Sequence, residues 1–104
     1  MAENYKLGEI ILMPRNKFSE EIEKDFKNVE ILLNGMLSDR SVPRNIKRVA
    51  QESIRIMQTE NETAGVIASN VMYLVSDLSQ DPNIPYHGRT VIYRIISILE
   101  QIKD

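Results

Sequence analysis

Two short stretches decide the predicted fold. They are DRSVPRNIKRVAQ at residues 39–51 and DPNIPYHGRTVIY at residues 81–93. Both carry Asp-x-x-[Val/Ile]-Pro, so Asp39 and Pro43 correspond to Asp81 and Pro85. An aspartate accepts backbone N–H bonds in a tight connection. Proline keeps the residue before it out of the helical region and suits the first turn of a helix. Each stretch therefore predicts a turn followed by a new helix.

The similarity extends beyond the two turns. A shift of 42 residues places one half of the chain on the other, with identical residues at Val29 and Val71, Leu32 and Leu74, Val49 and Val91, Ile54 and Ile96, and Ile56 and Ile98. The simplest explanation is two helical hairpins made by duplication. Two units are fewer than a helical solenoid needs, so we expect the hairpins to close on each other.

Apolar residues recur at steps of three and four between the prolines, which predicts helices. These helices are expected at about residues 17–38, 43–58, 60–79 and 84–103. Ser19 is a suitable N-cap for the first, and Thr59 with Glu62 fits a capping box before the third. The predicted fold is all-α, a four-helix antiparallel bundle built from two duplicated helical hairpins. It spans residues 16–104, with hairpins 17–58 and 60–103 after a short N-terminal arm at 1–15.

Composition excludes several classes of protein. The chain has 104 residues, 42% of them hydrophobic and 27% charged, with a formal net charge of −2 and no cysteine. This length suits one domain, and the lack of cysteine excludes disulfides, Cys-based zinc sites and thiol catalysis. The longest apolar run, Ile10–Met13, is too short for a signal peptide or a membrane span. We therefore expect a cytoplasmic protein without membrane contact.

Both turn stretches resemble those of a small archaeal family, the uncharacterised protein family UPF0147. The resemblance covers about residues 17–104 and includes Pro85, His87, Arg89 and Thr90 of the second stretch, whereas Gly88 departs from the alanine of the family motif. It implies a helical bundle of archaeal origin with no assigned activity.

Enzyme motifs are scarce in this sequence. The single histidine, His87, is interpreted as a structural hydrogen bonder, with a small-ligand or enzymatic module centred on it as the alternative. Asp39 and Asp81 are interpreted as turn residues, with a catalytic aspartate pair as the alternative. The sequence lacks nucleotide-binding and zinc-protease motifs and the Glu-x-x-His pattern of di-iron bundles. We expect no metal, no cofactor and no catalytic residue.

One outward surface is basic. At helical spacing Arg44, Arg48 and Arg55 fall on one face of the second helix, opposite its apolar stripe. We call this set the basic ridge. A solvated helix face is one interpretation, and a patch for RNA or an acidic protein is the other. The negative net charge argues against avid non-specific binding of nucleic acid.

A second outward surface is aromatic. Tyr86, Arg89 and Tyr93 are predicted to lie on the side of the fourth helix away from its core stripe. We call this set the tyrosine ridge. Tyrosine and arginine concentrate at binding hot spots, and they can also stack on bases. An ordinary surface with a cation–π contact is the alternative interpretation.

Three apolar side chains fall off the predicted core stripes: Ile31, Val66 and Tyr73. A broad buried face could absorb them; otherwise they form an apolar patch that suits self-association or a partner. The sequence thus predicts a non-enzymatic protein-interaction module that uses both ridges, with homo-oligomers as a further expectation. The alternatives are an RNA- or ribonucleoprotein-binding accessory factor and the module centred on His87.

Overall fold

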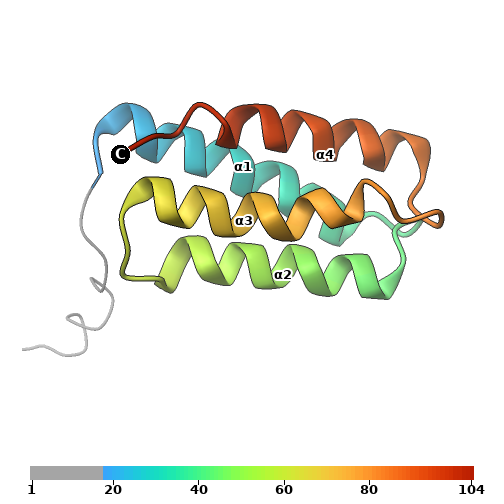
Figure 1. Cartoon of the computed structure of the whole chain (residues 1–104). Helices are drawn as coiled ribbons and strands as arrows, with labels where there is room; N and C mark the ends of the chain where they lie inside the picture. The colour runs from blue at the N-terminus through green and yellow to red at the C-terminus, as the bar shows by residue number, and fades with distance from the viewer. Residues whose placement is uncertain (1–17) are drawn as a thin grey trace, which may run out of the picture.

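The computed structural model describes residues 18–104, and these form four helices (Figure 1). They are α1 (Glu20–Ser38), α2 (Arg44–Thr59), α3 (Ala64–Leu78) and α4 (Tyr86–Leu99). Each observed helix lies within a few residues of its predicted range. The arm predicted at residues 1–15 lies outside the described part of the chain.

The helix starts follow from local hydrogen bonding. The Ser19 hydroxyl accepts the Ile22 N–H at 3.2 Å, which confirms it as the N-cap of α1. The capping box predicted at Thr59 is wrong. Thr59 ends α2 and donates its hydroxyl to the Arg55 carbonyl at 2.7 Å, whereas Thr63 caps α3 by accepting the Val66 N–H at 3.3 Å. A hydroxyl that back-bonds inside a helix is not available as a cap, so the next threonine takes that place.

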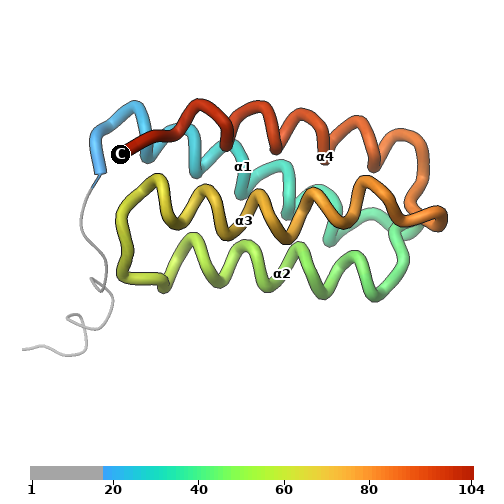
Figure 2. Tube along the Cα trace, in the orientation of Figure 1, coloured from blue at the N-terminus to red at the C-terminus, as the bar shows by residue number. Residues whose placement is uncertain are grey.

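Consecutive helices run in opposite directions, and α4 returns to pack beside α1 (Figure 2). Each helix therefore contacts two others, α2 and α4 occupy diagonal positions, and one apolar stripe of each helix faces the shared core. Leu33, Ile46, Val71 and Ile95, one from each helix, are fully buried. The predicted all-α four-helix bundle is confirmed, while its origin by duplication stays a prediction.

The lengths and hydropathy of these helices decide whether any of them could cross a membrane. Within residues 18–104, no helix combines the length and the apolar character that crossing a bilayer requires.

Candidate functional site

The two predicted turns have the same internal hydrogen bonds. Asp39 Oδ1 accepts the Ser41 N–H at 2.9 Å, and Asp81 Oδ1 accepts the Asn83 N–H at 2.8 Å. Val42 and Ile84 are buried beneath the two corners. Both aspartates therefore perform the turn chemistry that the sequence predicted.

Proline follows each turn at the helix boundary. Pro43 and Pro85 are the N-cap residues of α2 and α4, and both have a φ of −63°. Thr90, one turn into α4, donates its hydroxyl to the Tyr86 carbonyl at 3.4 Å. Gly88 is buried, and a Cβ built there would lie 3.1 Å from Ile84 Cγ1. The small residue therefore allows the first turn of α4 to pack closely on the corner.

The two turns are also joined to each other by side chains. His87 Nε2 lies 2.7 Å from Asp39 Oδ2, and Asn45 Nδ2 donates to Asp81 Oδ2 at 3.2 Å. His87 and Asn45 are 42 residues apart, as are Asp81 and Asp39. The same contact is thus made twice, once in each direction between the hairpins. His87 forms the structural hydrogen bond that the sequence favoured.

Hydrogen bonds lower the pKa of Asp39. The Ser41 hydroxyl donates to Asp39 Oδ1 at 2.6 Å, and His87 approaches the other carboxylate oxygen. In that order, the Ser41 hydroxyl, His87 and the Ser41 N–H lower the pKa of Asp39 from 3.8 to about 2. Each stabilises the charged carboxylate. Asp39 is therefore ionised throughout the neutral range.

The group of Asp39, Ser41 and His87 has the residue types of a catalytic triad but a different geometry. Ser41 Oγ lies 3.4 Å from His87 Nε2, the same ring nitrogen that contacts Asp39. A triad uses opposite nitrogens of the ring, one toward the serine and one toward the aspartate. The Ser41 hydroxyl also donates to the aspartate rather than to the histidine. The arrangement favours holding the turns together over activating a nucleophile.

The tyrosine ridge is only partly a free surface. Tyr86 is 84% exposed and Tyr93 is 54% exposed. Arg89 is half-buried, because its Nε donates to the Ser79 carbonyl at 3.0 Å and its Nη2 to the Asp81 carbonyl at 2.9 Å. Its guanidinium bonds the carbonyl of Ser79, the C-cap of α3, and the Asp81 carbonyl in the turn, which also accepts the Ile84 N–H at 3.3 Å. The sequence did not predict this role, since it depends on how the α3–α4 turn folds back.

The basic ridge lies on the outer, solvent-exposed face of α2. Arg44, Arg48 and Arg55 are all exposed. Arg55 pairs with Glu52, with Nη2 to Oε2 at 2.5 Å, which raises the pKa of Arg55 and lowers that of Glu52. Neither Arg44 nor Arg48 forms an ion pair within residues 18–104. Because α2 and α4 are diagonal and their core stripes face inward, the two ridges lie on opposite sides of the bundle.

An apolar groove between α1 and α4 was not predicted. A hollow of about 260 Å³ there is lined by Ile31, Leu32, Gly35, Met36, Asp39, Val42, His87, Gly88 and Val91. A second hollow of about 250 Å³ continues it along both helices, and the two share Ile31 and Leu32. The one signal in the sequence was Gly35, a glycine in the last turn of α1.

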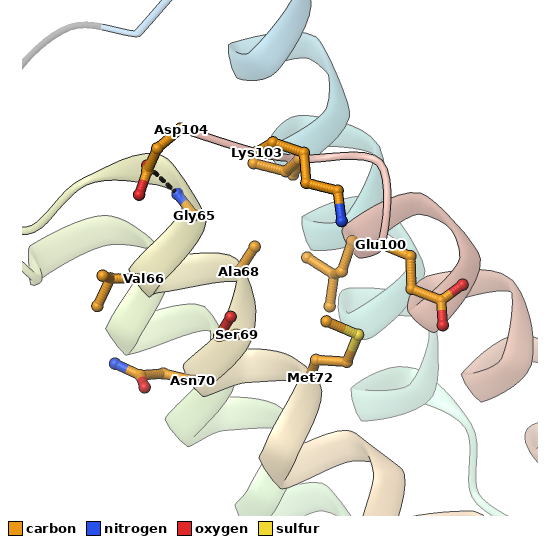
Figure 3. A pocket seen from close by; sticks show the side chains of 11 residues that line it. Gly65, Val66, Ala68, Ser69, Asn70, Met72, Glu100, Lys103 and Asp104 are labelled. Carbon is orange, nitrogen blue, oxygen red and sulfur yellow. Dashed lines mark hydrogen bonds between the residues drawn. The ribbon is translucent and has the colours of Figure 1, made fainter.

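A larger hollow of about 520 Å³ lies between the start of α3 and the end of α4 (Figure 3). Asp104 closes one side, because its carboxylate accepts the Gly65 N–H at 2.7 Å and the Thr63 hydroxyl at 2.9 Å. Glu100 and Lys103 place opposite charges along the α4 side (Figure 3). Across the described chain, no group of three or more metal-ligating side chains is suitably placed to hold a metal ion.

Comparison with known proteins identifies the family. The profile of the uncharacterised protein family UPF0147 matches residues 13–102. A UPF0147 protein of Saccharolobus islandicus is 44% identical over 82 residues, covering 79% of this chain and 92% of the relative. A UPF0147 protein of Methanothermobacter thermautotrophicus is 43% identical over 79 residues, covering 76% of this chain and 78% of the relative.

A solved structure agrees with these matches. The crystal structure of a UPF0147 protein from Thermoplasma acidophilum is 35% identical and superposes with a TM-score of 0.75. It covers 82% of this chain and 100% of the solved chain. The sequence relatives and the solved fold therefore agree over most of the molecule. The protein belongs to the uncharacterised protein family UPF0147.

Proposed function

We propose that this protein is a non-enzymatic protein-interaction module of the archaeal cytoplasm, and that it binds a protein partner through the outer face of α4. The observation that supports this most is the exposure of Tyr86 and Tyr93, two turns apart on one helix face. Neither phenol hydroxyl has a hydrogen-bond partner within the described chain. Tyrosine supplies a large, rigid contact area with a polar tip, which is why it concentrates at binding hot spots.

Arg89 has a supporting role in this proposal. Its guanidinium is held by the Ser79 and Asp81 carbonyls. It thereby fixes the α3–α4 turn from which α4 starts, and so it orients the first tyrosine. Partner contact then depends mainly on Tyr86 and Tyr93.

RNA or ribonucleoprotein binding is the second candidate, and the exposed arginines of α2 favour it. Arg44 and Arg48 keep their charges uncompensated by ion pairs among the described residues, whereas Arg55 is paired with Glu52. Arginine suits bidentate contacts with phosphate. Since the basic ridge lies across the bundle from the tyrosines, the two candidates can be tested separately.

The duplication remains part of the proposal. The two turns have matching hydrogen bonds, and the cross-contacts of Asp39 and Asp81 repeat with the 42-residue offset. Two hairpins descended from one ancestor would form such contacts reciprocally when they pack together. Departures such as Tyr86 in place of Arg44 would then reflect specialisation of the second hairpin.

The proposal is tested by affinity capture with the full chain from the native host lysate, with and without nuclease. A Tyr86→Ser/Tyr93→Ser double variant tests the tyrosines, and Tyr73→Ser is the matched control on α3. We expect a specific partner that survives nuclease, is lost with the double variant and is kept by the control. The opposite result would be a partner that is lost on nuclease treatment and in Arg44→Glu/Arg48→Glu but is kept by the tyrosine variant. That result would support RNA binding through the basic ridge instead.

A further inference from the structure

Nothing in residues 18–104 requires glycine at position 35. It lies in α1, and a Cβ built there would meet no atom within 4 Å. Its φ is not positive, so the backbone does not require glycine. Glycine nevertheless weakens the interior of a helix relative to alanine. Gly35 lies in the last turn of α1, and it leaves a gap in the side-chain surface there that nothing inside the described bundle requires.

Ile31 supplies a protruding side chain next to the gap at Gly35. It lies one turn before Gly35 and is 57% exposed. Both residues border the apolar groove between α1 and α4, where Leu32 and Val91 are half-buried. One face of α1 thus carries a protruding apolar side chain directly beside a position without one.

This pattern is self-complementary, and we propose that the outer face of α1 binds a second copy of the same chain. The two α1 helices would pack antiparallel about a two-fold axis near the level of Leu33. In this register Ile31 of each copy lies opposite Gly35 of the other. A two-fold interface needs such a patch, because the same surface must supply both the protrusion and the gap.

Charge and polarity match in the same register. Positions equally far from the axis meet, which places Lys27 opposite Asp39 of the second copy and Asn28 opposite its Ser38. The Lys27 side chain is 70% exposed, with one ion pair of 4.0 Å to Glu30 of its own helix, and the charged Asp39 carboxylate is 29% exposed. A parallel arrangement would instead place Lys27 against Lys27. Electrostatic complementarity of this kind fixes register and suppresses the wrong orientation.

The first test is sedimentation velocity on the full chain over a range of concentrations. We expect a concentration-dependent dimer for the wild type and a monomer for both Ile31→Asp and Gly35→Leu. The matched control is Val66→Asp, an exposed apolar residue on α3, and it should dimerise like the wild type. Thermal unfolding followed by circular dichroism shows that each variant folds, and Gly35→Leu should not melt earlier than the wild-type monomer.

The second test determines the relative orientation of the two α1 helices. Because the chain has no cysteine, only the introduced cysteines can form disulfides. Ile31→Cys and Gly35→Cys chains are mixed and oxidised under mild conditions. The antiparallel pair should yield the mixed disulfide in several-fold excess over either self-disulfide. Excess self-disulfides would mean a parallel or different interface and would overturn the proposal.

Two further results would also overturn it. One is a wild type that stays monomeric at every concentration. This is also the result expected if Ile31 contacts an unrelated protein instead of a second copy. The other is a dimer that persists in both Ile31→Asp and Gly35→Leu. Neither result depends on the tyrosine ridge, since Tyr86→Ser/Tyr93→Ser should leave the dimer unchanged.

Discussion

Replacing Ser53 with alanine should stabilise this protein. Ser53 lies within α2, its side chain is fully buried, and its hydroxyl has no hydrogen-bond partner in the described part of the chain. Burying a hydroxyl without a partner costs about 1–3 kcal/mol in proteins. Serine is also about 0.5 kcal/mol less favourable than alanine inside a helix. Both terms favour the substitution.

The gap left by one oxygen atom opposes them by up to about 1 kcal/mol. The net expectation for Ser53→Ala is a free energy of unfolding higher by about 1–2 kcal/mol. In a domain of this size that corresponds to a melting temperature higher by roughly 5–10 °C. Guanidinium denaturation at equilibrium measures the free energy, and calorimetry measures the melting temperature.

Ser69→Ala is the matched control for this prediction. Ser69 is exposed on α3, so its substitution changes helix propensity alone and should add only about 0.5 kcal/mol. The difference between the two variants isolates the cost of the buried hydroxyl. If Ser53→Ala unfolds at the same or a lower denaturant concentration than the wild type, the reasoning is refuted and the hydroxyl has a partner in solution.

The other predictions concern α1 and the turns. Gly35→Ala should raise the free energy of unfolding by about 1 kcal/mol at low protein concentration, because the new methyl group meets nothing and alanine favours helix; a loss in urea denaturation would contradict this. Asp39 has a folded pKa of about 2, below its ordinary 3.8, so its contacts stabilise the fold above about pH 4 and are lost as the pH falls through about 2. Acid unfolding should therefore show the wild type more stable than Asp39→Asn at neutral pH, with the difference vanishing near pH 2; a constant difference would count against it. Arg89→Met should lower the free energy of unfolding by about 2 kcal/mol, because it removes two charge-assisted bonds from a half-buried site; circular dichroism melts check it, and no change would show that these bonds contribute little.

Several features of this fold could be predicted from the sequence because they are local. The apolar stripes at helical spacing identified the four helices. The Asp-x-x-[Val/Ile]-Pro stretches at Asp39 and Asp81 predicted both corners, since one oxygen of each carboxylate accepts a backbone N–H two residues along the chain. The predicted start of α3 was wrong because local sequence alone does not choose between two threonines. Thr59 and Thr63 are equivalent as caps until the end of α2 is known.

The candidate sites were less predictable. Periodicity placed Tyr86 and Tyr93 outside correctly, because a side chain opposite the core stripe faces solvent. Periodicity gave Arg89 the same exposed position, but a long side chain beside a turn can fold back onto the carbonyls of that turn. The groove along α1 was missed because it belongs to two helices, and only Gly35 marked it.

The sequence by itself thus determined the helices, their buried faces and the chemistry of each turn, since these follow from interactions within a few residues. Only the tertiary structure decided which turn met which. It brought His87 to Asp39 and Asn45 to Asp81, placed the basic and tyrosine ridges on opposite sides, and set Ile31 beside an open groove. Those outcomes depend on how four apolar stripes close around one core, and no local pattern contains that arrangement.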